Sequence, residues 1–240
     1  MAKQKGAQAK SKSPLLDKIS SMALKVLLWF LTATILWVLI YRFVDPPITL
    51  LMIQRNIERS NEDKPHKMEK KWVDFEDMSD NMKRAAVSAE DQLFLKHIGF
   101  DVKAIEKAFQ TNKKGKKIKG GSTISQQTAK NVFLWPGRSW IRKGFEAYFT
   151  LLIELFWSKE RILEVYLNVI EMGDGIYGAE AAAQAYYGKS CTKMSRAQAA
   201  LIAACFPNPR RWTPKKATTY IRHRQYLIMR NMRRLGPLDF

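Results

Sequence analysis

The feature that most constrains this chain is a long apolar stretch near its N-terminus. Residues from Val26 to Tyr41 carry no charge, and the apolar stretch runs from Met22 to Val44 if the long side chain of Lys25 reaches outward. At a helical rise of about 1.5 Å per residue, such a stretch spans roughly the 30 Å of a bilayer core. A membrane-spanning helix over residues 22–44 is therefore expected.

The flanks of the stretch predict its orientation. The preceding residues 1–21 are rich in lysine, which favours a cytoplasmic N-terminus. Arg42 and later basic residues weaken this argument, although large domains are translocated regardless of charge. Aromatic residues that suit the membrane interfaces are Trp29, Trp37 and Tyr41.

Two other interpretations of the apolar stretch are less favoured. A cleaved signal peptide would need a site of the small-x-small type, and none follows before Arg42. A buried core helix would need an outward polar face, and Thr32 and Thr34 do not mark one.

The charge of the chain predicts an anionic partner. The sequence has 41 Lys and Arg against 22 Asp and Glu, which gives a formal charge of +19. A nucleic acid, an acidic membrane surface or a phosphorylated substrate would each fit this charge. Cys191 and Cys205 could pair in an oxidising compartment, but two buried thiols are the favoured interpretation.

The 240 residues suffice for one compact domain and a short appendage. The expected parts are a basic tail (1–21), the membrane helix (22–44), a linker (45–71) and one domain (72–240). The hydrophobic pattern of the last part is helical almost throughout, so the expected fold class is mostly α.

Helical spacing and capping residues predict the elements of this domain. One helix begins near Ser79, with an apolar stripe at Met82, Ala86, Ala89 and Leu93. Helices are also expected over 139–157, 159–170 and 177–187, and capping boxes open two more at Thr123 and Ser195. The pair Asp174-Gly175 lies between helical stretches, so no hairpin is expected there.

Glu90 is the first candidate catalytic residue. On a helix its neighbours would be Ala86 and Leu93, so its carboxylate borders the apolar stripe. Partial desolvation raises a carboxyl pKa toward the value that a general base needs near neutral pH. An ordinary surface glutamate at a helix end is the alternative. His97 is expected to be a structural histidine, because no second His or Cys lies at ligand spacing.

A helix start led by glycines is a candidate phosphate site. Gly120 and Gly121 let the backbone approach a ligand closely, and the helix that begins at Thr123 offers free N–H groups to an anion. Lys130 lies one turn beyond Gln126 and adds a positive charge. The spacing is not that of a nucleotide P-loop, and a capped helix after a flexible loop is the alternative.

A second carboxylate, Glu146, follows Arg142 by four residues. A solvent-exposed helical ion pair is a sufficient account of this spacing. Sugar-diphosphate chemistry would instead require Glu90, Glu146 and several cations to share one cleft. The basic run over residues 113–119 is typical of a solvated loop and also suits an anionic lipid surface.

Together, five stretches of the sequence resemble the ordered motifs of a glycosyltransferase family. This family includes the monofunctional biosynthetic peptidoglycan transglycosylases and the polymerase domains of bifunctional penicillin-binding proteins. The stretches cover roughly residues 72–215 and begin at Glu90, Gly120, Arg142, Ile162 and the alanine-rich run before Tyr186. No transpeptidase sequence follows them, so the monofunctional type is expected.

The resemblance implies a lysozyme-like fold with two lobes, of which the smaller faces the membrane. Glu90 would be the catalytic base. Glu146 would be the second catalytic carboxylate, near the diphosphate or near a divalent cation such as Mg or Mn, which the resemblance does not make essential. Residues implied to bind the substrate or its phosphates are Ser122, Gln127, Lys130, Asn131, Arg138, Arg142 and Lys143.

The implied reaction joins lipid II into β-1,4-linked glycan strands and releases undecaprenyl diphosphate. Because a diphosphate is already a good leaving group, the enzyme needs cations more than a protonating acid, and a base at the acceptor hydroxyl. The implied location is the outer side of a bacterial inner membrane. The implied partners are lipid II, the growing strand, membrane lipids and wall-synthesis or cell-division proteins, without nucleic acid.

Two other functions fit parts of the sequence. A lysozyme-like lytic enzyme would use Glu90 as an acid to cleave glycan, but this interpretation gives the cluster of Arg and Lys no role. A basic membrane protein that binds nucleic acid would account for the +19 charge. It predicts salt-sensitive DNA binding that Glu90→Gln does not change.

Overall fold

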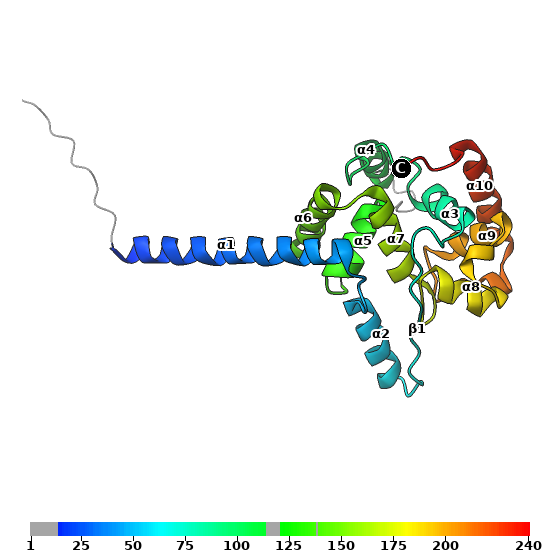
Figure 1. Cartoon of the computed structure of the whole chain (residues 1–240), viewed down its shortest axis with the longest axis horizontal. Coiled ribbons are helices and arrows are strands. Elements are labelled where there is room, and N and C mark those ends of the chain that lie inside the picture. Colours follow the sequence, from blue (N-terminus) through cyan, green and yellow to red (C-terminus); the bar gives the residue numbers. More distant parts are fainter. Residues whose placement is uncertain (1–13, 114–120, 138) are drawn as a thin grey trace, which may run out of the picture. The chain divides into compact units, whose positions relative to one another are not determined.

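A computed structural model describes residues 14–113, 121–137 and 139–240. The chain divides into two compact units, Met1–Ile40 and Tyr41–Phe240. Figure 1 labels the helices of both units and strand β1.

The first unit contains most of helix α1 (Pro14–Phe43). This helix has an apolar span of 24 residues, Ser20–Phe43, with a mean hydropathy of 2.2. Only 11% of its most apolar window is buried, and Trp29 is 74% exposed, so the helix is not part of a protein core. Its length and composition allow it to cross a membrane, as expected for a single-pass anchor.

The second unit is mostly helical, as the sequence predicts. Its helices are α2 (Leu50–Asn61), α3 (Asp80–Glu90), α4 (Val102–Lys113), α5 (Ile124–Phe133), α6 (Trp140–Phe156), α7 (Lys159–Val169), α8 (Ala179–Tyr187), α9 (Arg196–Cys205) and α10 (Thr219–Leu235). Single turns of 3-10 helix lie at Cys191–Lys193 and Pro214–Lys216. A small sheet has the order β1 (Glu69–Lys70), β3 (Ile176–Tyr177) and β2 (Glu171–Gly173), with β1 parallel and β2 antiparallel to β3.

Side-chain caps determine where several helices begin. Thr123 forms a capping box with Gln126 at α5, and Ser195 forms one with Gln198 at α9, as the sequence predicts. The predicted starts of other helices are also confirmed, because their first N–H groups bond to the side chains of Ser79, Ser139 and Ser158.

Two local predictions are wrong. Helix α3 ends at Glu90, so Leu93 lies beyond it and is 38% exposed instead of extending the apolar stripe. Strands β2 and β3 form a hairpin around Asp174-Gly175, where none was expected. Gly175 has a φ of +70°, which suits a tight hairpin turn. The strands have only three and two residues, too few to show an alternating pattern.

Residues 45–71, interpreted from the sequence as a linker, contain α2 and β1. Cys191 and Cys205 are free and buried, which confirms two separate thiols. Burial raises the pKa of the Cys191 thiol to about 12 and that of the Cys205 thiol to about 11, so both stay protonated near neutral pH.

Helix α7 is the central element of the second unit. All residues from Ile162 to Val169 are buried, and α7 packs against α5, α6 and α8 (Figure 1). On the other side of the unit, α3 packs against α9 and α10. The end of α3 is thereby held within the core, which positions Glu90.

The fourth sequence motif, on α7, holds the segment that leads into α3. The Asn168 amide donates to the carbonyl of Val73 at 2.9 Å and accepts from the Val73 N–H at 3.0 Å. Glu164 Oε1 accepts from the Phe75 N–H at 3.2 Å. These residues therefore stabilise the approach of the chain to α3.

Asn168→Ala is expected to lower the free energy of unfolding by about 1–3 kcal/mol, because both part-buried backbone groups of Val73 lose their partner. Urea unfolding of the detergent-solubilised protein, followed by circular dichroism, measures this change. The matched control is Asn61→Ala, at an exposed position at the end of α2, with an expected change within about 0.5 kcal/mol. Equal losses in the two variants would show that Asn168 does not support this segment.

Candidate active site

Glu90 is the last residue of α3 and is half-buried. Gln127 Nε2, on α5, donates a hydrogen bond to Glu90 Oε2 at 2.8 Å. Since α5 begins directly after the glycine motif, this bond brings the first and second motifs together. One carboxylate oxygen of Glu90 is held by Gln127, which leaves Oε1 for another partner.

The surroundings of Glu90 favour its protonated form. Burial raises the pKa of the Glu90 carboxyl, while the bond from Gln127 and the charges of Arg224 and Lys130 act in the opposite direction. The net result is a pKa above the ordinary value of a glutamate. A carboxylate of this kind can accept a proton near neutral pH.

Asp91 fixes the end of α3 in front of α5. Its buried carboxylate accepts from the Ile124 N–H at 3.0 Å through Oδ2 and bonds to His97 Nε2 at 2.9 Å through Oδ1. His97 is thus a structural, hydrogen-bonding histidine, as the sequence predicts. The position of Glu90 next to Gln127 follows from these two bonds.

Gly99 allows the loop after α3 to approach the start of α5. Its φ is +76°, and a Cβ at this position would lie 2.7 Å from Thr150 Cγ2. The hydroxyl of Thr123 donates to the carbonyl of Gly99 at 2.6 Å. A side chain at position 99 would therefore clash with α6 and displace the loop whose carbonyl Thr123 binds.

A cleft of about 260 Å³ lies beside Glu90. Its lining includes Glu90, Asp91, Asp101, Gly121, Ser122 and Thr123. Ser122 is exposed at this cleft, and it comes from the glycine motif. The cleft is therefore built where the first two motifs meet.

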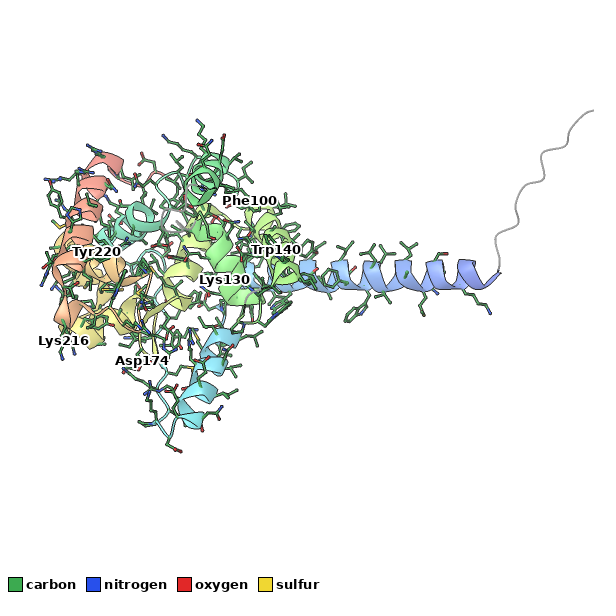
Figure 2. All side chains as sticks on the ribbon, turned by 180° about the vertical axis from the view of Figure 1, so that it is seen from behind. Phe100, Lys130, Trp140, Asp174, Lys216 and Tyr220 are labelled. Carbon is green, nitrogen blue, oxygen red and sulfur yellow. The ribbon has the colours of Figure 1, made fainter. Side chains whose placement is uncertain are left out.

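Lys130 lies on α5, one turn after Gln127 (Figure 2). Burial lowers the pKa of its ammonium group, and the charge of Glu146 raises it. Arg142 and Lys143 lower this pKa further, whereas Glu90 raises it. Both carboxylates thus favour the charged form of Lys130.

Glu146 lies on α6 and is only 3% exposed. Its Oε1 accepts a short hydrogen bond from Lys143 Nζ, and its Oε2 lies 3.7 Å from Arg142 Nη1. The solvent-exposed ion pair considered from the sequence is thus a buried one. The Nε of Arg142 is also buried, and it has no hydrogen-bond partner in the described part of the chain. This unused donor next to Lys130 and Lys143 suits an anion.

The remaining predicted site residues have different positions. Asn131 is 7% exposed and follows Lys130 on α5. Arg138 lies outside the described residues, as do Gly120 and the basic run over 114–119. The roles assigned to the site residues by resemblance stay predictions.

The Transglycosylase family model matches residues 56–233, which is most of the chain. The chain belongs to the transglycosylase family. It is 48% identical to the biosynthetic peptidoglycan transglycosylase of Pseudomonas fluorescens over 216 residues, or 90% of each chain. The identity to the protein of the same name is 50% in Stutzerimonas stutzeri, over 88% of each chain, and 46% in Pseudomonas syringae, over 94% of this chain and 96% of the relative.

The transglycosylase is thus a peptidoglycan glycosyltransferase of cell wall synthesis.

Arg224 is a further charged residue near Glu90 that the sequence does not predict. It lies on α10, where its Nε donates to the carbonyl of Ala204 at 3.1 Å, and its charge lowers the pKa of Glu90. No sequence signal separates it from the other basic residues of α10, such as Arg222 and Arg230. Only the packing of α10 on α3 brings it near the carboxylate.

The described residues do not fit a preformed metal site. Among them, no group of three or more His, Cys, Asp or Glu side chains could hold a metal ion. The predicted ligand, Glu146, already pairs with Lys143 and Arg142. The positive charge beside Glu146 comes from side chains of the transglycosylase itself.

Proposed function

We propose that this transglycosylase polymerises lipid II into β-1,4-linked glycan strands, with inversion at the anomeric carbon and release of undecaprenyl diphosphate. The observation that carries this proposal is the hydrogen bond from Gln127 to Glu90, because it places the carboxylate next to α5, on which Lys130 follows Gln127 by one turn. Glu90 then acts on the acceptor hydroxyl, and nearby cations act on the diphosphate that leaves the donor sugar.

Glu90 acts as the general base. Its carboxylate removes the proton from the 4-hydroxyl of the acceptor sugar while this oxygen attacks the anomeric carbon of the donor. The bond between the anomeric carbon and the phosphate oxygen breaks, and its electron pair leaves with the diphosphate. Support comes from the raised pKa of Glu90 and from Gln127, which orients the carboxylate.

Lys130, Arg142 and Lys143 receive the departing diphosphate. Its charge grows as the bond breaks, and preplaced cations stabilise that charge most where water is excluded. The buried Nε of Arg142, unpaired among the described residues, supports this role. Glu146, itself buried, holds Arg142 and Lys143 in position through ion pairs. By resemblance, Arg138 joins these cations, and Ser122 and Asn131 position the sugars.

These side chains supply the positive charge that the reaction needs, so no step of the proposal passes through Mg or Mn. Helix α1 would anchor the enzyme in the bacterial inner membrane with the catalytic domain on the outer side. Lipid II stays tethered to the same membrane, and wall-synthesis or cell-division proteins are proposed as partners there.

The test is incubation of the full-length protein with lipid-linked disaccharide-pentapeptide. Polymer and free undecaprenyl diphosphate are expected products. A lytic enzyme would instead clear mature cell wall and form no polymer. Salt-sensitive DNA binding without either activity would favour the nucleic-acid alternative.

The rate of polymerisation should fall at both ends of the pH range. Glu90 must be deprotonated to act, so activity is lost as the pH falls through its raised pKa, above the ordinary value of 4.5. Lys130 must be charged, so activity is lost as the pH rises through its lowered pKa, below the ordinary value of 10.5. The pH profile of kcat/KM measures both limits.

The matched variant for the alkaline limit is Lys130→Arg, because a guanidinium stays charged throughout this range. The alkaline limit should move upward in this variant while the acidic limit remains. An acidic limit at the ordinary pKa of glutamate would show that the base is not a Glu90 whose pKa is raised by burial.

A further inference from the structure

Helix α2 has its apolar residues on the outside. Leu50, Ile53 and Ile57 are 44%, 41% and 55% exposed, respectively. Their spacing of three and four residues places them on one face of the helix. A helix on the surface of a soluble domain normally has the opposite arrangement, with apolar residues inward.

The opposite face of α2 is attached to the domain by ion pairs and by one buried apolar side chain. Arg59 Nη1 lies 2.6 Å from Asp174 Oδ2, and Arg55 Nε lies 3.5 Å from Glu171 Oε2. Met52 is fully buried, and α2 packs against α5. The direction in which α2 presents its apolar stripe is therefore set by specific contacts.

Within the second unit, Arg161 binds the first residues, 41–45, which include the last residues of α1. Its guanidinium donates to the carbonyls of Tyr41 and Val44 at 3.1 and 3.0 Å and pairs with Asp45 at 3.0 Å. Glu164 Oε2 accepts from the same group at 2.7 Å, which orients it. The first residues after the apolar span are thus fixed to the domain.

Lys70 holds the next part of the connection. Its Nζ donates to the carbonyl of Pro46 at 2.6 Å and to that of Pro47 at 2.8 Å. Helix α2 starts at Leu50, seven residues after the end of α1 at Phe43. Even a fully extended chain of this length reaches only about 25 Å, so α2 begins close to the membrane that α1 would span.

The connection itself continues the apolar surface. Phe43, Val44 and Ile48 are 78%, 53% and 41% exposed. Large apolar side chains are thus exposed along the chain from the end of α1 to the last turn of α2. Contiguous apolar surface of this kind marks an interaction site, and its covalent continuity with a membrane-spanning helix favours the bilayer as the partner.

We propose that α2 is an interfacial helix that inserts Leu50, Ile53 and Ile57 into the outer leaflet of the membrane spanned by α1. Interfacial helices bury their apolar face about 5–10 Å into the boundary between headgroups and acyl chains. The inference depends on the proposed membrane anchoring and not on the proposed catalytic roles. It assigns α2 as a second membrane contact, which restricts rotation of the catalytic domain about α1.

The experiment places an environment-sensitive fluorophore (NBD) on single introduced cysteines of the full-length protein in phospholipid vesicles. The test position is Ile57→Cys. The control is Tyr220→Cys on α10, which is 53% exposed and lies away from α2 in Figure 2. Cys191 and Cys205 are 0% exposed, so they should remain unlabelled. Acrylamide quenches the fluorophore from water, and doxyl-labelled lipids quench it from the bilayer.

At about one protein per vesicle, acrylamide quenching is expected to be several-fold weaker at position 57 than at position 220. Doxyl lipids should quench position 57 and leave position 220 unaffected. Equal acrylamide quenching at both positions would overturn the proposal. Protection of position 57 that requires many copies per vesicle would also overturn it, because the stripe would then contact protein. Adding Glu90→Gln leaves this readout unchanged, so the catalytic proposal can fail independently.

Discussion

Glu90→Gln is expected to lower kcat/KM for polymerisation by about 10²–10⁴-fold, which is the usual contribution of a general base. The amide has the same shape as the carboxylate and can still accept the bond from Gln127, but it cannot take the proton of the acceptor hydroxyl. The measurement uses lipid-linked disaccharide-pentapeptide and follows polymer formation on gels.

The matched control for this substitution is Glu160→Gln, which removes the same charge from an exposed position on α7. Its rate should equal that of the unsubstituted enzyme. Turnover near this level in Glu90→Gln would remove residue 90 from the role of base.

The same variant should also report on the environment of Glu90. Because burial raises the pKa of Glu90 above 4.5, the folded state binds the proton more tightly than the unfolded state. The ionised carboxylate therefore destabilises the fold as the pH rises through this range. Glu90→Gln should be at least as stable as the unsubstituted protein at about pH 7, and the difference should vanish below about pH 4. Thermal unfolding midpoints measure this.

The helices could be predicted because their signals are local. The capping boxes of Thr123 with Gln126 and of Ser195 with Gln198 are contained within four residues each. The end of α3 could not be predicted in this way. Asp91 accepts from the Ile124 N–H, 33 residues further along, and no pattern around position 90 contains that partner.

The residues of the candidate site could be named from the sequence, but their environment could not. A spacing of four residues between Arg142 and Glu146 is equally typical of an exposed pair, whereas in the structure their side chains are only 11% and 4% exposed. Arg224 comes near Glu90 only through the packing of α10. Whether side chains of different helices come close depends on how the helices pack, and the spacing of residues along the sequence does not show this.

The residues of the family motifs fall into two groups, one beside the cleft and one that holds the backbone. Glu90 and Gln127 bond to each other, and Glu90 lines the cleft. Glu164 and Asn168 instead bond to backbone groups of the segment before α3. Substitutions in the first pair are thus expected to change the reaction rate, and substitutions in the second pair to change stability.

Lys130→Ala is expected to lower kcat/KM by about 10²–10³-fold, because it removes a preplaced charge at the leaving diphosphate. It should also move the acidic limit of the pH profile upward, since Lys130 lowers the pKa of Glu90. The control is Lys103→Ala at an exposed position on α4, and both variants should float equally with vesicles. A loss confined to membrane affinity would contradict phosphate contact. A rate loss without the shift in pH would mean that Lys130 acts on the diphosphate alone and does not couple it to the base.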